Sequence, residues 1–224
     1  EGNLEEYKVS SSQVMGIRVG KDQKIGISYC EDMQEDSLSI MVDQALENSK
    51  YVKEDEYEEI CVAHKDRVFA DNEKTYREDN TPAEKKIELC LDLEKGIKAK
   101  DSSVKSAPYN GYSEGESASY IANSLGTLCF EKSRSFSCYT SALIEKDGKQ
   151  SMHYHGSVGR VFKELNPTNC IEESFKHANS LLNAGPVATG QYDVIFSLDM
   201  LDDLFGVFST MFSGKSSMDG VNPM

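Results

Sequence analysis

The sequence is poor in the residues that build self-contained metal and redox sites. It has 224 residues but only four histidines, and its six cysteines are widely scattered with no CxxC pair. Structural zinc sites and disulfide frameworks need such residues at close, regular spacing. We therefore expect no metal or other cofactor in this chain, and reduced, buried thiols as in a cytoplasmic protein. The cysteines are Cys30, Cys61, Cys90, Cys129, Cys138 and Cys170.

Basic charge and long apolar runs are lacking as well. The chain has 24 basic residues (Lys and Arg) against 38 acidic ones (Asp and Glu), a formal net charge of −14. A field of this sign repels phosphate backbones, so we expect no direct binding of nucleic acid. No apolar run approaches the roughly 18 residues of a membrane span, so we expect no membrane partner. The chain opens with Glu1 and not with Met, and we expect the natural N-terminus to lie further upstream.

The first third of the chain has the pattern of an α+β domain. Residues 6–30 alternate like two strands joined around the turn Gly20-Lys21-Asp22, and residues 36–51 carry apolar side chains at helical spacing. Residues 52–80 are acidic and show no clear period, so we expect a connector with one short element. We predict an N-terminal α+β domain with its connector over residues 1–80.

A helix and an antiparallel meander are predicted next, as a middle domain over residues 81–185. Thr81 and Glu84 stand in capping-box register around Pro82, which suits the first helical position of a helix that ends near Lys100. Short strands are predicted between residues 104 and 160, with a two-residue hairpin turn at Asp147-Gly148. On the strand 135–146, four alternating side chains should share one face: Cys138, Thr140, Ala142 and Ile144.

Two further helices are predicted toward the C-terminus. Residues 170–185 read as a helix, with Asn169 and Glu172 in capping-box register and Gly185 as its stop. Residues 192–198 read as a buried strand, and the apolar residues of 199–214 recur at three- and four-residue steps, typical of an amphipathic helix.

His153 and His155 are the first candidates for chemistry. They flank Tyr154, so on a strand both imidazoles point to the same side, as in half of a metal site. The other histidines, His64 and His177, are distant in sequence, and we interpret the pair as part of a solvated hairpin face.

Other candidate sites are weaker still. A nucleophilic thiol would need a histidine beside it, and Cys90 and Cys138 stand at apolar positions that favour the core. The glycines of 111–115 lie between strands, and Glu114 and Glu116 disfavour an anion there. The acidic run Glu54, Asp55, Glu56, Glu58 and Glu59 is typical of a solvated segment. The residues alone thus indicate an acidic α+β protein without catalytic, cofactor-binding or metal-binding residues.

Several stretches, read in order, resemble the TldD/PmbA family, bacterial proteins once called modulators of DNA gyrase. These stretches are NLEEYKVSSSQVMGIRVGKDQKIGISYCED at 3–32, TPAEKKIELCLDLEK at 81–95, ANSLG at 122–126, GRVFKELNPTN at 159–169 and PVATGQYDVIFSLDML at 186–201. Family chains continue into a large third domain. The resemblance therefore implies that residues 186–224 are the start of a C-terminal domain that is mostly absent.

The resemblance also implies a function. The family works as a pair that trims peptides. A TldD-type subunit carries a His-Glu-x-x-x-His zinc motif on the helix after the third-domain strand, and a PmbA-type subunit (also called TldE) lacks it. Here the matching helix has Gly206, Val207, Met211 and Phe212, which cannot bind zinc, and Asp202 and Asp203 alone do not make a site.

The resemblance thus implies a PmbA/TldE-type subunit that is inactive alone. Its expected partners are a zinc-containing TldD-type subunit and a peptide substrate, and its helix over 199–214 is expected to pack. Two alternatives stay open: a stand-alone peptide- or protein-interaction module, and a regulatory protein associated with gyrase.

Overall fold

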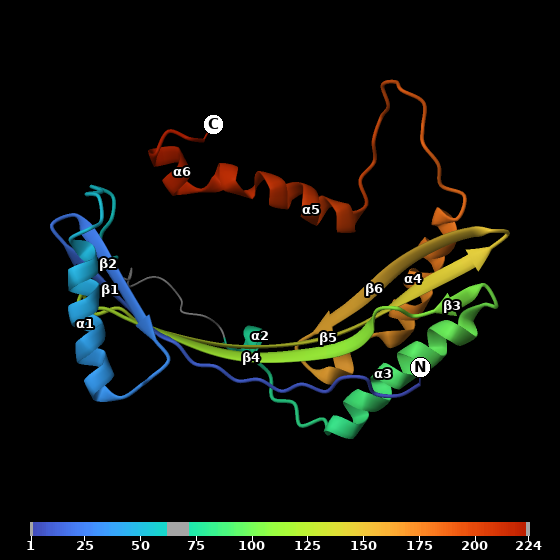
Figure 1. Ribbon diagram of the computed structural model, residues 1–224, viewed down its shortest axis with the longest axis horizontal. Coiled ribbons are helices and arrows are strands. Elements are labelled where there is room, and N and C mark those ends of the chain that lie inside the picture. The colour runs from blue at the N-terminus through green and yellow to red at the C-terminus, as the bar shows by residue number, and fades with distance from the viewer. Residues whose placement is uncertain (1, 62–71, 223–224) are drawn as a thin grey trace. The chain divides into compact units, whose positions relative to one another are not determined.

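The computed structural model describes residues 2–61 and 72–222 (Figure 1). The chain divides into two compact units, Glu1–Ala184 and Gly185–Met224. The fold is α+β with antiparallel sheets, as the sequence predicts. The further division of the first unit at residue 80 stays a prediction. Within the described residues, no helix combines the length and the apolar character needed to cross a membrane.

The N-terminal part is a β-hairpin covered by one helix. Strands β1 (Met15–Lys21) and β2 (Lys24–Cys30) pair antiparallel, and helix α1 (Glu35–Ser49) packs on them. The predicted turn is shifted: Lys21 still pairs with Lys24, so Asp22 and Gln23 turn the chain, with φ of 52° and 59°. A two-residue turn with both φ positive matches the right-handed twist of the strands, which fixes this tighter register.

Helix α1 approaches the hairpin closely at one glycine. A Cβ atom on Gly26 would lie 1.8 Å from the carbonyl oxygen of Ala45 and 2.7 Å from the nitrogen of Ser49. Only a residue without a side chain fits there, and Ala45 is itself fully buried. The small residues at this crossing set the spacing between the helix and the strands.

The middle part is a four-stranded antiparallel sheet. Its strands are β3 (Val104–Ser106), β4 (Asn110–Ala122), β5 (Leu128–Lys146) and β6 (Lys149–Gly159), and β5 pairs with each of the others. The predicted meander is confirmed, although its short strands fuse into longer ones. The predicted hairpin is confirmed too, with φ of 53° at Asp147 and 72° at Gly148.

Two helices, α3 (Ala83–Lys100) and α4 (Pro167–Leu181), cover the same face of this sheet (Figure 1). The predicted alternation on β5 is confirmed, because its four inward side chains are all fully buried: Cys138, Thr140, Ala142 and Ile144. They pack against Leu93 and Ile97 of α3 and against Ala178 of α4. Burial of this apolar surface is the main force that holds the unit together.

Both predicted capping boxes are wrong. Helix α3 begins at Ala83, after Pro82 as N-cap, and has no side-chain cap, since the N–H of Thr81 instead donates to the carboxylate of Asp79. Helix α4 begins at Pro167, one turn earlier than predicted. It starts there because a proline is preorganised for the first helical position. The side chain of Asn166 caps it by accepting from the N–H of Asn169.

The described part of the connector, residues 52–61 and 72–80, contains one short element, in line with the prediction. Helix α2 (Asn72–Thr75) lies against β5. The side-chain oxygen of Asn72 accepts from the N–H of Lys132, and the hydroxyl of Thr75 donates to the carbonyl oxygen of Lys132. A 3-10 turn η1 (Phe162–Glu164) joins β6 to α4. The turn η1 forms part of the site described below.

The second unit consists of α5 (Leu198–Phe208), η2 (Ser209–Phe212) and α6 (Gly214–Met218). The predicted strand over 192–198 is wrong: residues 191–197 have no regular structure, and Ile195 is 98% exposed. A strand needs a neighbour for its N–H and C=O groups, and no strand of the described residues pairs with this segment.

Candidate functional site

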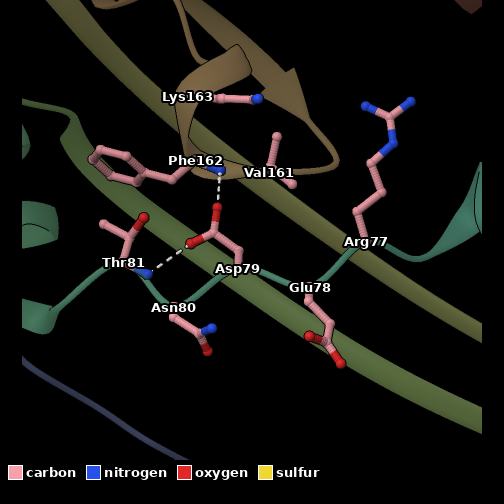
Figure 2. A pocket seen from close by; sticks show the side chains of 8 residues that line it. All are labelled: Arg77, Glu78, Asp79, Asn80, Thr81, Val161, Phe162 and Lys163. Carbon is pink, nitrogen blue, oxygen red and sulfur yellow. Dashed lines mark hydrogen bonds between the residues drawn. The ribbon is translucent and has the colours of Figure 1, made fainter.

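A hollow of the first unit lies between the segment that enters α3 and the turn η1. It has a volume of about 540 Å³ and is open to solvent (Figure 2). Its lining residues are Arg77, Glu78, Asp79, Asn80, Thr81, Val161, Phe162 and Lys163. The sequence did not indicate this site, because its two walls are about 80 residues apart in the chain.

Asp79 is the central side chain of this pocket. Its two carboxylate oxygens accept the N–H of Thr81 at 2.9 Å and the N–H of Phe162 at 2.8 Å (Figure 2). Arg134 donates to the carbonyl oxygen of the same residue at 3.2 Å. Burial acts to raise the pKa of Asp79, but the hydrogen bonds from Thr81 and Phe162 and the charge of Arg134 outweigh it and hold the pKa below its ordinary value.

The charges at the rim pair with one another. Arg77 forms an ion pair with Glu164, whose other carboxylate oxygen accepts the N–H of Arg160 at 2.8 Å. Arg160 also donates to the carbonyl of Arg134 at 3.0 Å. These contacts, like those of Asp79, tie backbone segments together. The pocket is therefore better suited to holding η1 in place than to acid–base catalysis.

Cations stack on aromatic rings next to this pocket. The ammonium of Lys132 lies 3.7 Å from the ring centre of Tyr76, and the guanidinium of Arg134 lies 5.3 Å from that of Phe136. Glu116 lies within ion-pair distance of both cations, at 3.0 Å and 3.8 Å. The cationic side chains are thus occupied by structural partners.

The glycine-containing stretch 111–115 lies inside strand β4 and forms no anion-binding loop. Glu114 accepts from Lys86 at 2.7 Å and from the hydroxyl of Tyr112 at 2.8 Å. Burial and this carboxylate both raise the pKa of Tyr112 above its ordinary value. Tyr112 therefore stays a neutral hydrogen-bond donor at physiological pH.

The structure brings His177 of α4 to His153, which corrects the interpretation that His177 is remote. It also corrects the prediction of a solvated face, because His153 and His155 pair with the buried residues Ala142 and Thr140 and are themselves half-buried under α4. Because α4 packs along β6, the ring centres of His153 and His177 lie 4.8 Å apart. His177 Nε2 is 3.3 Å from a carboxylate oxygen of Glu173, and His155 Nε2 is 3.1 Å from the amide of Asn169. Over residues 2–61 and 72–222, no three His, Cys, Asp or Glu side chains are arranged to hold a metal ion. His64 lies outside the described residues.

The cysteines are less uniformly buried than predicted. Only Cys138 and Cys170 are fully buried, whereas Cys30, Cys90 and Cys129 are partly buried and Cys61 is exposed. All six are free thiols. Burial raises the pKa of Cys90, as expected for a core thiol. The sequence did not reveal that Cys138 and Cys170 lie in contact, because they are 32 positions apart.

Helix α5 and the turn η2 carry the positions that the resemblance compares with a zinc motif: Gly206 and Val207 lie in α5, and Met211 and Phe212 lie in η2. The N-terminus of α5 is capped by Ser197, whose side chain accepts from the N–H of Met200. The prediction that this helix packs is wrong for the described residues: Phe205 is 64% exposed and Val207 is 74% exposed. Too few residues of the second unit surround the helix to cover it.

Family models match two regions of the chain. Residues 76–182 match the model described as PmbA/TldA metallopeptidase central domain, and residues 1–49 match PmbA/TldA metallopeptidase domain 1. No curated protein matches the chain.

Solved structures share the fold. A proposed modulator of DNA gyrase from Thermotoga maritima is 20% identical, with a TM-score of 0.66, over 84% of this chain and 42% of that chain. Its counterpart from Bacteroides thetaiotaomicron is 17% identical, with a TM-score of 0.70, over 90% and 47%. TldE from Thermococcus kodakarensis is 18% identical, with a TM-score of 0.68, over 99% and 50%. The chain thus spans about half the length of these structures.

Proposed function

We propose, because this chain belongs to the PmbA/TldD metallopeptidase family, that it is part of a PmbA/TldE-type subunit. This subunit completes a two-chain zinc peptidase without supplying the zinc site. The observation that carries the proposal is helix α5, which follows residues 186–197, the stretch that resembles the entrance to the third domain. Residues 206–212 of this helix and of η2 contain no histidine, cysteine or carboxylate.

A zinc peptidase needs protein donors that leave one metal position open. There the metal polarises the peptide carbonyl and lowers the pKa of the attacking water to about 7. Asp202 and Asp203 are exposed on α5, but they are adjacent in sequence and have no histidine on the next turn. The zinc and the general base are therefore assigned to a TldD-type partner, and this chain contributes structure and surface.

The sheet face opposite α3 and α4 supports a protein partner. Its side chains include Tyr139, Met152, Tyr154 and Val158, with exposed fractions of 39%, 40%, 64% and 74%. The solvated face of an antiparallel sheet is usually polar, and a contiguous apolar patch marks a surface that another polypeptide covers. We assign this face, defined by these four residues, to the TldD-type subunit.

A peptide-release assay tests the pairing. The natural protein alone and the TldD-type partner alone should release little or no product from an unfolded peptide. The mixture should cleave it, and a chelator should abolish the cleavage. Metal-dependent cleavage by this protein alone would contradict the proposal.

Zinc content gives a second test that needs no substrate. Elemental analysis of the purified chain should find no stoichiometric zinc, whereas the complex should hold zinc that disappears when the partner's motif histidines are replaced. One tightly held zinc per copy of this chain would show that residues distant in sequence bind the metal together, and would contradict the non-catalytic assignment.

Matched tyrosine variants test the surface. Tyr154→Ser should weaken association with the partner about tenfold or more, as expected when an interfacial aromatic is removed. Tyr51→Ser is the control, because Tyr51 is 82% exposed and lies outside this face. Equal affinities for the two variants in a titration would show that the face is covered by something other than the TldD-type subunit.

The same family membership suggests the compartment. Six free thiols are compatible with a reducing environment. We therefore place the pair in the cytoplasm, with peptides as its substrate class. Fractionation of cells that produce the tagged natural protein, with a periplasmic marker as control, checks this placement.

A further inference from the structure

Two buried cysteines meet between strand β5 and helix α4. The Sγ atoms of Cys138 and Cys170 lie 4.0 Å apart, and the thiol of Cys170 also lies 3.7 Å from the carbonyl oxygen of Cys138. Both side chains are fully buried in one cluster with Leu93. A disulfide has an S–S length of about 2.05 Å, so the sulfur atoms need to approach by about 2 Å to form one.

The two thiols differ in chemical character. Cys170 lies in the first turn of the 15-residue helix α4, where the positive end of the helix dipole favours a thiolate. The hydrogen bond from the thiol of Cys138 lowers the pKa of Cys170, and that same bond together with burial raises the pKa of Cys138. Cys170 is therefore the thiol that reacts first, and Cys138 is placed to react second.

We propose that Cys138 and Cys170 are an oxidation site, which a hydroperoxide converts into an intrachain disulfide that fastens α4 to β5. This inference is independent of the proposed peptidase role. It rests on the contact between the two thiols. Cys170 lies at a helix N-terminus, and neither thiol is exposed to thiols of other molecules.

The chemistry balances with hydrogen peroxide as the oxidant. The Cys170 thiolate attacks one peroxide oxygen, the O–O bond breaks, and the departing hydroxide takes a proton to leave as water. The sulfur of Cys138 then attacks the sulfenic acid of Cys170, the S–O bond breaks, and a second water leaves with the proton of Cys138. Two electrons pass from the thiols to the peroxide, and one S–S bond is formed.

The cross-link should have a measurable physical effect. It joins residues 32 positions apart, so it restricts the unfolded chain and should raise the Tm by about 5–10 °C. Oxidant reaches the buried thiols during local opening of the helix, so the reaction should be slower than oxidation of an exposed thiol. Dithiothreitol should restore the original Tm.

The test uses the natural protein treated with hydrogen peroxide and digested without reduction. Mass spectrometry should find one peptide pair that joins Cys138 to Cys170 and is lighter by two hydrogen atoms than the reduced pair. A thiol titration should show that the treatment removes two more thiols from the natural protein than from Cys170→Ala, because exposed thiols such as Cys61 react in both. Finding other cysteines oxidised while Cys138 and Cys170 stay as thiols, or finding them oxidised separately to sulfonic acids, overturns the proposal.

Two alanine variants complete the test. Cys170→Ala should lose both the cross-linked peptide and the rise in Tm, whereas the matched control Cys129→Ala should keep both. If Cys170→Ala does not fold, the peptide map of the natural protein still decides the question by itself. A peroxide-induced rise in Tm of the same size in Cys170→Ala would show that another pair is responsible and would refute the assignment.

Discussion

The two halves of strand β5 differ in burial, although in both halves successive side chains alternate between the two faces of the sheet. Residues 128–135 pair with β4 alone, and Leu128 in this half is 70% exposed. Residues 136–146 pair with β6 on one side and with β4 or β3 on the other, and they lie under α3 and α4. Phe136 in this half is fully buried. One strand thus runs from a solvated ribbon into a hydrophobic core.

The side chains change at the point where α3 and α4 no longer cover the strand. On the face that continues from Phe136, the next two residues outward are Arg134 and Lys132, which stack on aromatic rings and pair with Glu116. Beyond them Phe130 contacts Tyr120 across the ribbon, with ring centres 4.6 Å apart. Period-two alternation therefore identifies the face of a strand, whereas the covering elements decide how deeply that face is buried.

The largest expected effect comes from the buried half. Phe136→Ala should lower the free energy of unfolding of the first unit by about 3–5 kcal/mol, because it leaves a cavity under a side chain with no exposed surface. Urea unfolding followed by circular dichroism measures the change. A loss below about 1 kcal/mol would mean that the two halves do not differ in energy.

A smaller effect is expected when the hydrogen bonds of Asp79 are weakened. Asp79→Asn should cost about 1–2 kcal/mol, because an amide has one acceptor oxygen for the two N–H groups of Thr81 and Phe162. The pKa of Asp79 is lowered in the folded protein. Its carboxylate therefore stabilises the fold above the unfolded pKa of about 3.9, and this stabilisation is lost as the pH falls through the folded pKa.

The pH dependence separates this role from a general packing defect. The difference in stability between the natural protein and Asp79→Asn should be largest above about pH 5 and should shrink toward pH 2. Urea unfolding at several pH values measures it. Glu78→Gln serves as the control, because Glu78 is exposed beside the same pocket. A difference that is constant with pH would refute the electrostatic account.

The exposed half should respond weakly. Phe130→Ala removes a side chain that is already 37% exposed and that contacts Tyr120, so we expect a loss of about 1 kcal/mol. The same urea experiment as for Phe136→Ala gives a direct comparison. Equal losses for the two variants would show that the ribbon is as tightly packed as the core.

The smallest effect is expected in the second unit. Phe205 is 64% exposed, so Phe205→Ala should change the stability of this chain by no more than about 0.5 kcal/mol. The same change could still weaken a complex in which that surface is covered. Thermal unfolding of this chain measures the first quantity, and a loss above about 2 kcal/mol would mean that Phe205 is packed in solution.

Local patterns in the sequence were sufficient wherever a feature depends on neighbouring residues. The hairpin at Asp147-Gly148 follows from the two positive φ angles that its turn requires, and the inward face of β5 follows from the geometry of any strand. The family resemblance was recognisable for a similar reason, since its motifs are contiguous stretches in a fixed order. The two predicted capping boxes failed because a neighbouring residue satisfied the position differently. Helix α4 begins one turn earlier, at Pro167, and the N–H of Thr81 donates to Asp79.

Only the tertiary structure decided which distant residues meet. The packing of α4 on the sheet brings His177 to His153 and Cys170 to Cys138, and the turn η1 brings Phe162 to Asp79. Residues 192–198 look like a buried strand in sequence, but a strand exists only where a neighbour accepts its backbone hydrogen bonds, and none of the described residues supplies one. Alternation and helical period are properties of a segment alone, whereas burial, pairing and pKa depend on what covers that segment, which one-dimensional spacing does not encode.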